Sequence, residues 1–547
     1  MSHFVCKTCG KEGAFGGKYS AIGCATWRKF TSPCPPCVKL DILDRQISET
    51  KAFLNHLEAH RGILKTGINE AHDPFTKLLP TEVTSQIFQL CVNEEDLDSG
   101  LESWPLHRVP FTLSAVSKRW QAVAKLNTSL WTVIHLRLDP GQTPGLSKET
   151  LDDWLSRSSP HPLTIQLHIQ YCHSRDFSWR AFCRSIISTL NSYSTRWGGI
   201  SLKIPENLLP FFQADIPGTP LLRSLSIERT FPGDFGDQDD TTFTFDLKTT
   251  LPAPNSVSLS GYQLRVAHID WSNVTRADIS GLTAHEALKM LHLAPEMREC
   301  TLRNIDEEGS IHQLHGQNIV HTNLTTLDVH IIIDQISLFF GHLTAPSLKN
   351  LSYECPGESL EPVMAFLRRS SCPLITFTLF HEECMLIHDH EHLELLRTVP
   401  TLRTLKIYDF DIFDKFFELL EQPNSYDEEN DDECLFLPSL TSLFLDCQYG
   451  AFKFSWPAIY RMIAARVSPE WKKKGRGVLA RVEVHLCFNE GGNGCYIDEE
   501  SLEGFQRLID DGVEIVLRNQ MPEEDVIAYS KRYHADMKAE RMEIRDW

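Results

Sequence analysis

The stretch LTTLDVHIIIDQISLFFGHLTAPSLKNLSYEC, residues 324–355, decides the fold. It contains two short segments, 324–331 and 348–355, in which Leu, Val or another apolar residue recurs at alternate positions. Alternation with a period of two is typical of a β-strand that is buried on one face. A less regular segment separates the two, so the stretch consists of a strand, a connection and a second strand.

The same pattern recurs over most of the chain. Further alternating segments lie at 162–169, 198–204, 222–228, 274–281, 297–305, 374–380, 402–410, 440–447, 479–486 and 512–519. Their spacing is mostly in the twenties, near the ~20–29 residues of leucine-rich repeats, and one strand with its helix cannot bury its own apolar face. Residues 136–521 are therefore predicted to form a leucine-rich-repeat-like α/β solenoid with a curved parallel sheet. The alternative is an ordinary α/β domain, which would need two or more sheets.

Composition restricts the classes of protein that this sequence fits. The chain has 547 residues, 42% of them hydrophobic and 23% charged, as in ordinary globular proteins with several domains. The net charge of −20 makes nucleic acid a poor partner. The first residues, MSHFVCKTCGKEG, lack the apolar run of a signal peptide, and no apolar stretch approaches the ~18 residues of a membrane span. We therefore expect no membrane association, mostly reduced cysteines, and a cytoplasmic or nuclear location.

The N-terminal residues 1–38 are rich in Cys and Gly. Cys6 and Cys9 form one C-x2-C pair, and Cys34 and Cys37 form another. Four thiolates at such spacing are suited to a tetrahedral structural zinc site, with Cys24 as a possible replacement for one ligand. The alternative is a disordered tail with incidental cysteines.

Residues 39–73 are predicted to be helical. Apolar residues follow an alternating spacing of three and four, interrupted by Thr50 and Arg61. The apolar positions are Leu40, Leu43, Ile47, Leu54, Leu57 and Leu64. This interrupted heptad seam is suited to packing on another helix or on the domain to which it belongs, and a self-associating coiled coil is the alternative. At the other end of the chain, residues 522–547 form a charged tail that is predicted to be a helix or cap.

Two further polar segments contain clusters of side chains that are also found in binding sites. The stretch HEECMLIHDHEH, residues 381–392, contains potential metal ligands, but we interpret it as a polar loop that leads into a helix at 392–397. The acidic run at 426–433 is interpreted as a solvated loop. No phosphate-binding loop, dinucleotide fingerprint, nucleophile elbow or HExxH motif is present in the sequence, so we expect that the protein is not an enzyme.

Residues 74–135 contain two helical patterns, 80–92 and 111–126, separated by a polar loop at 93–110 and followed by an alternating strand at 131–138. The segments LLPTEVTSQIFQLC and LSAVSKRWQAVAKLNTSLWTVI resemble the F-box-like domain of a large fungal family of F-box proteins. The matching residues are Leu79, Pro80, Glu82, Ile87, Phe88, Cys91, Val116, Arg119, Trp120, Ala124, Leu130 and Trp131. Val83 and Ser117 depart from the family pattern, as does the stretch at 127–129, without changing its apolar positions.

The resemblance implies a substrate-recognition adaptor of a Skp–cullin–F-box ubiquitin ligase. The F-box would bind a Skp-type adaptor through Leu79, Pro80, Val83, Ile87, Phe88, Val116 and Trp120. The repeat domain would bind an unknown protein substrate on its sheet, and polarity selects Arg223, Arg303, Asp328, His330, Lys406 and Tyr408 as candidates. The alternative is a non-catalytic interaction scaffold with a degenerate F-box.

Overall fold

The structure is a computed structural model of the chain. It describes residues 3–5, 12–14, 35–73, 78–93, 109–140, 146–170, 177–214, 221–230, 243–248, 251–305, 318–331, 335–355, 359–381, 389–408, 413–421, 435–447, 454–473, 476–487, 496–520 and 523–545. The chain divides into two compact units. The first consists of Met1–Gly100 and Arg108–Leu130, and the second of Leu101–His107 and Trp131–Trp547.

The first unit is mainly helical. Its elements are the strand pair β1 (His3–Val5) and β2 (Glu12–Ala14) and the helices α1 (Pro35–Ala71), α3 (Thr81–Asn93), α4 (Val109–Val116) and α5 (Lys118–Leu126). Phe88 of α3 is 2% exposed and contacts the ring of Trp120 on α5, with 4.8 Å between the ring centroids. The indole Nε1 of Trp120 donates a hydrogen bond of 2.9 Å to the carboxylate of Asp73. These contacts form the core of the unit and join the end of α1 to it.

The helix expected at 111–126 is wrong in one respect, because the chain forms two helices there. Ser117 has extended backbone angles, φ −155° and ψ 163°, and its hydroxyl accepts a hydrogen bond from the backbone N–H of Trp120. A serine in this role satisfies an amide that the first turn of a helix leaves unpaired. The continuous apolar spacing hid this break, since Val116 and Trp120 keep helical spacing across it.

The second unit is built on a sheet of 15 strands within the described residues. The strands are β3 (Val133–Leu138), β4 (Leu163–Ile169), β5 (Trp197–Ile204), β6 (Ser224–Arg229), β7 (Ser256–Ser260), β8 (Arg276–Ser280), β9 (Glu299–Ile305), β11 (Thr326–Ile331), β13 (Asn350–Cys355), β14 (Thr376–His381), β15 (Thr404–Tyr408), β16 (Ser442–Cys447), β17 (Arg481–Leu486), β18 (Glu514–Gln520) and β19 (Glu523–Asp525). Each strand pairs with its neighbours in this order, and every pair is parallel except β18 with β19. The expected parallel arrangement is confirmed, and the alternative with two or more large sheets is wrong.

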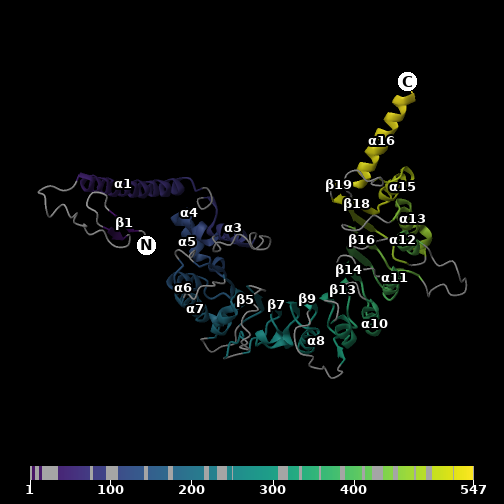
Figure 1. The fold of residues 1–547 in the computed structure, drawn as a ribbon, viewed down its shortest axis with the longest axis horizontal. Helices are drawn as coiled ribbons and strands as arrows, with labels where there is room; N and C mark the ends of the chain where they lie inside the picture. The colour runs from purple at the N-terminus through teal and green to yellow at the C-terminus, as the bar shows by residue number, and fades with distance from the viewer. Residues whose placement is uncertain are drawn as a thin grey trace. The chain divides into compact units, whose positions relative to one another are not determined.

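Helices connect many of these strands, and one more helix follows the last strand. They are α6 (Lys148–Arg157), α7 (Phe177–Asn191), α8 (Ala284–Leu293), α9 (Ile336–His342), α10 (Glu361–Ser370), α11 (Asp389–Arg397), α12 (Asp414–Glu421), α13 (Trp456–Val467), α14 (Pro469–Lys473), α15 (Glu499–Asp510) and α16 (Val526–Arg545). In the second unit, α6, α7, α8, α10, α11 and α13 lie on one side of the strands (Figure 1). The apolar strand residues that alternate, such as Leu351 and Tyr353, are buried, as Phe340 and Phe366 of the helices are. Tyr353 and Phe366 each contact the ring of Phe340, so the core lies between strands and helices.

A repeated backbone pattern sets the register at the start of the strands. The N–H groups of Lys349 and Asn350 both donate to the carbonyl of Thr325 in the preceding repeat. In the next repeat, the N–H groups of Ile375 and Thr376 both donate to the carbonyl of Lys349. Because each strand is anchored to the previous one in this way, the apolar positions line up across the sheet.

All 12 segments expected to be strands between 162 and 519 lie in the sheet. The prediction missed β7, in which Ser256, Ser258 and Ser260 alternate with only two apolar residues. It also placed the strand at 131–138 in the F-box-like domain, whereas β3 is the first strand of the sheet. The charged tail forms β19 and the helix α16, and β19 pairs antiparallel with β18 at the end of the sheet.

Candidate functional site

The sheet has one face with helices and one face that we call the open face. The side chains of the open face belong to the strand residues that alternate with the buried apolar residues. Register aligns them in rows, of which the middle row includes Asp328, Ser352, Thr378, Lys406, Phe444 and Glu483. The end row, nearer the carboxyl ends of the strands, includes His330, Glu354, Phe380, Tyr408, Asp446 and His485. Both rows run across consecutive strands from β11 to β17.

Five rings of these rows form a continuous series, which we call the aromatic ladder: His330, Phe380, Tyr408, Phe444 and His485. Successive ring centroids lie 5.9, 4.5, 5.0 and 5.0 Å apart. All five side chains are half-buried on the described surface. Aromatic side chains that stay partly exposed on a sheet face provide large, rigid contact area for another molecule.

A histidine between two carboxylates forms one end of the ladder. His330 Nε2 lies 3.3 Å from Asp328 Oδ1, and His330 Nδ1 forms a hydrogen bond with the carboxylate of Glu354. The interaction with Asp328 raises the pKa of His330, and Glu354 adds to the effect against the opposing effect of burial. Burial acts to raise the pKa of Asp328, but hydrogen bonds from His330 and Ser352 outweigh it, so that this pKa lies below its ordinary value. The cluster therefore favours a protonated His330.

Charged side chains also border the other end of the ladder. Glu483 accepts hydrogen bonds from His485 Nε2 at 2.9 Å and from Arg481 Nη2 at 2.7 Å. Tyr408 is the middle ring of the ladder, and burial, followed by the nearby Asp446 and Glu483, raises its pKa. Tyr408 therefore stays neutral and keeps its hydroxyl proton for donation at neutral pH.

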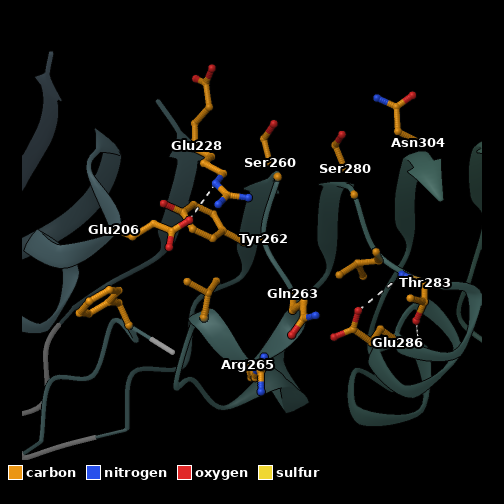
Figure 2. A pocket seen from close by; sticks show the side chains of 16 residues that line it. Glu206, Glu228, Ser260, Tyr262, Gln263, Arg265, Ser280, Thr283, Glu286 and Asn304 are labelled. Atoms are coloured by element: carbon orange, nitrogen blue, oxygen red, sulfur yellow. Dashed lines mark hydrogen bonds and ion pairs between the residues drawn. The ribbon is translucent and has the colours of Figure 1, made fainter. Parts of the chain in front are cut away.

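A pocket of about 630 Å³ lies at the carboxyl ends of β6–β9 (Figure 2). Its lining includes the hydroxyls of Ser260 and Ser280, together with Gln263 and Asn304. Gly261 and Gly281 have positive φ angles of 75° and 86° where the chain leaves β7 and β8. A Cβ at Gly281 would lie 3.4 Å from the Cα of Gly261, so the two turns pack closely and leave the space above them open.

The carboxylates in this pocket already have partners. Glu206 forms an ion pair of 2.8 Å with Arg229, and Glu228 is paired with Lys203 of β5. Glu286 closes the capping box of α8 with Thr283 and also accepts from the backbone N–H of Leu264. The pocket therefore offers hydroxyl and amide groups for hydrogen bonds to a polar ligand, while its carboxylates are held by other groups of the protein.

On the first strands, the open face carries basic side chains in place of the aromatic ladder, and the sequence analysis did not identify them. Arg137, His168 and Lys203 occupy neighbouring positions of one row on β3, β4 and β5. Burial, followed by the charges of Arg137 and Lys203, lowers the pKa of His168. Arg137 is paired with Asp139 at 2.9 Å, so this end of the face is basic but partly neutralised.

The structure brings together four of the six residues expected to bind a substrate. Asp328, His330, Lys406 and Tyr408 all lie on the open face between β11 and β15. Arg303 lies on the adjacent β9, where it forms an ion pair of 3.4 Å with Asp278. Arg223 is exposed just before β6 and lies apart from this group. The ladder partners Phe380, Phe444 and His485 were missed, although apolar residues at positions that alternate with the core leucines were a readable signal.

The residues expected to bind a Skp-type adaptor divide into two groups. Phe88 lies in the core, and Leu79, Ile87, Val116 and Trp120 are half-buried. Pro80 and Val83 are exposed at the start of α3. Leu78 and Leu90, which are not among the residues expected to bind the adaptor, are 80% and 60% exposed. Leu78 and Pro80 lie just before α3 and Val83 and Leu90 lie on it, so these exposed apolar side chains are all at or on this helix.

The proposed zinc ligands Cys6, Cys9, Cys34 and Cys37 lie outside the residues whose side chains the structure describes. The same holds for residues 382–388 of the histidine-rich stretch and for the acidic run at 426–433. The helix that follows the histidines, α11, begins at Asp389 rather than at 392. Within the described part of the chain, no group of three or more His, Cys, Asp or Glu side chains is arranged to hold a metal ion.

No family model matches the sequence, and a search of curated proteins finds no similar one. Among the residues whose placement is described, no helix is long and apolar enough to cross a membrane. The functional assignment therefore depends on the geometry of the open face and of α3.

Proposed function

We propose that the protein is a non-catalytic substrate-recognition adaptor of a Skp–cullin–F-box ubiquitin ligase. The helices of the first unit would bind a Skp-type adaptor, and the open face of the second unit would bind a protein substrate in the manner of a leucine-rich-repeat domain. Ubiquitin transfer would then be catalysed by the ligase and its conjugating enzyme. The protein itself would supply proximity, which raises the effective concentration of substrate lysines.

One observation carries the proposal for the first unit. Phe88 and Trp120 already close the core of this small helical unit, yet Val83 and Leu90 of α3 lie on the surface, as does Pro80 just before it. Exposed apolar side chains that gather on one helix face are typical of a protein-binding surface. In the fungal F-box family that this sequence resembles, the F-box helices contact the Skp-type adaptor.

The open face supports the second half of the proposal. Stacked strand repeats present a long sheet face, which is the usual binding surface of repeat proteins. The aromatic ladder and its flanking charges cover β11 to β17, where half-buried rings and polar groups can both contact a partner. The carboxylates in the neighbouring pocket are held in ion pairs or a helix cap, which favours binding over acid–base catalysis.

The test is capture of a Skp-type adaptor and cullin from the same organism by the full-length protein. The double change Leu79→Ala, Pro80→Ala should abolish capture, since burial of one leucine side chain contributes roughly 1.5–3 kcal/mol, or about tenfold to a hundredfold in affinity. Leu126→Ala is a matched control, because Leu126 is an exposed leucine on α5. Failure of the wild-type protein to capture any such adaptor would leave the scaffold with a degenerate F-box as the function.

The substrate surface is tested separately, once a partner has been captured. Charge reversal by Asp328→Lys and Lys406→Glu should weaken partner binding without unfolding the protein, because both side chains lie on the open face. If the partner instead responds only to changes in the acidic run at 426–433, the open face is not its binding site.

A further inference from the structure

The long helix α1 exposes an apolar seam that no described residue of its own unit covers. The seam side chains with spacing of three and four are 45% to 57% exposed, namely Leu40, Leu43, Ile47, Leu54, Leu57, Leu64 and Ile68. Among the described residues, hydrogen bonds join α1 to the rest of the unit at its end, where Asn69 donates to the carbonyl of Val116, and Asp73, just beyond the helix, accepts from Trp120. Packing of the seam on its own domain, one of the sequence-based expectations, is therefore not observed in the described residues.

We propose that α1 pairs in antiparallel orientation with α1 of a second copy of this chain. The seam extends over nine heptad positions, of which only those of Thr50 and Arg61 are not apolar. In a heptad seam of this kind, the apolar side chains of one helix pack between those of a second helix that has the same seam. An exposed apolar strip of this length, even with its two interruptions, is also unusual on the surface of a monomer.

The orientation follows from the charges that flank the seam. The residues that follow the second seam position of each heptad are Asp44, Lys51, Glu58 and Lys65, and all four are exposed. In an antiparallel pair these positions face one another across the seam. A single register, with its twofold axis between Asn55 and His56, sets Leu54 opposite Leu57 of the other copy and brings Asp44 close to Lys65 and Lys51 close to Glu58. Symmetry forms each pair twice, so all eight side chains meet an opposite charge.

A parallel pair would not match charges in this way. The flanking positions would then pair Lys39 with Asp44, but also Gln46 with Lys51 and His60 with Lys65. Only the first of these pairs is attractive, and His60 next to Lys65 becomes repulsive when the histidine is protonated. Charge complementarity therefore selects the antiparallel dimer.

Sedimentation of the full-length protein over a range of concentrations tests the dimer. The wild-type chain should sediment as a dimer, and the double change Leu54→Asp, Leu57→Asp should yield a monomer with an unchanged circular-dichroism signal from the sheet. Ile63→Asp is the matched control, because Ile63 is 71% exposed and lies off the seam. A wild-type protein that is monomeric at every concentration would overturn the proposal.

Charge exchange tests the orientation with variants that keep the seam intact. Asp44→Lys alone should raise the dissociation constant of the dimer by roughly threefold to thirtyfold, since it replaces two attractive pairs by repulsive ones. Adding Lys65→Asp should restore the wild-type constant. Restoration by Lys39→Asp instead of Lys65→Asp would show a parallel pair and contradict the antiparallel assignment. Because the Skp-type adaptor would bind α3, a failed dimer and a failed adaptor interaction are separate results.

Discussion

The ring of Phe380 on β14 stacks on the ring of Tyr408 on β15, with 4.5 Å between the centroids and 15° between the planes. The two residues are direct partners in the register of these strands. Their stacking faces the open side of the sheet, so it does not depend on the core beneath. Cross-strand aromatic pairs of this kind stabilise a sheet beyond the area that they bury.

A double-mutant cycle should measure this stack. We expect the free energies of unfolding of Phe380→Ala, Tyr408→Ala and the double variant to give a coupling of about 0.5–1.5 kcal/mol. Thr378 and Lys406 are a matched control, because they are direct partners on the same two strands and the same face. Urea denaturation followed by circular dichroism supplies the values. A coupling no larger than that of the control pair would mean that the rings do not interact in solution.

The cluster of Asp328, His330 and Glu354 predicts a pH dependence of stability. The pKa of His330 is raised above its ordinary value of 6.5, so its stabilising effect is complete below about pH 6.5 and is lost as the pH rises through the folded-state pKa. The pKa of Asp328 is lowered below 3.8, so its stabilising effect is complete above that value and is lost only in stronger acid. The cluster is therefore most stabilising between these two values.

The measurement compares two histidine variants on the same face. His330→Gln should lower the thermal midpoint more at pH 6 than at pH 8. His168→Gln should show the opposite trend, because the pKa of His168 is lowered and its charging destabilises the fold as the pH falls. Equal behaviour of the two variants across this range would contradict the assigned directions.

The strands could be predicted because one face of the sheet is buried. Alternation of Leu, Val and Ile reports that burial directly, and it placed the strands that contain Leu327, Leu351 and Leu405 correctly. It failed at β7, where small serines fill the polar positions and only Val257 and Leu259 mark the core. It also failed at Ser117, because a helix cap depends on one hydrogen bond rather than on apolar spacing.

The candidate site was only partly predictable for a different reason. Polarity identified Asp328 and Lys406 as open-face residues, but it passed over Phe380 and Phe444, which resemble core residues in a sequence. The contact between Tyr408 and Phe444 depends on the register of β15 against β16, and a long connection separates these two strands in the sequence. Register across such long connections is set by tertiary packing, which a local pattern does not contain.

Zinc binding at the N-terminus remains a prediction from spacing. Purified protein should contain close to one zinc ion per chain, and Cys34→Ser should lower that content because it removes one of four thiolates. Cys183→Ser is the control, since Cys183 is buried and burial raises the pKa of its thiol to about 12. Elemental analysis measures both variants. A folded, metal-free wild-type preparation would exclude the site, and the sheet should stay folded in either case because its core is separate.

A buried arginine links helix α13 to helix α12 and to the segment before β16. Arg466 of α13 is 1% exposed, and its guanidinium donates to the carbonyls of Leu420, Phe436 and Leu437 at 2.6 to 2.7 Å. Burial lowers its pKa to about 9, which still leaves the group charged at neutral pH. Leu420 lies in the last turn of α12, and Phe436 and Leu437 precede β16, so this side chain provides hydrogen bonds to carbonyls outside regular helix and strand pairing.

Arg466→Met should therefore lower the free energy of unfolding by about 3–5 kcal/mol, because it removes three charge-assisted hydrogen bonds to buried carbonyls, of which the carbonyl of Leu437 keeps the N–H of Leu440 as a donor. Arg466→Lys should recover only part of the loss, since an ammonium group lacks the planar fork that reaches three acceptors. Arg461→Met is the control on the same helix. Arg461 is exposed and forms an ion pair of 3.4 Å with Glu421, which is worth under about 1 kcal/mol. Urea denaturation should separate the two methionine variants clearly, and similar losses at both positions would show that the carbonyls find other donors.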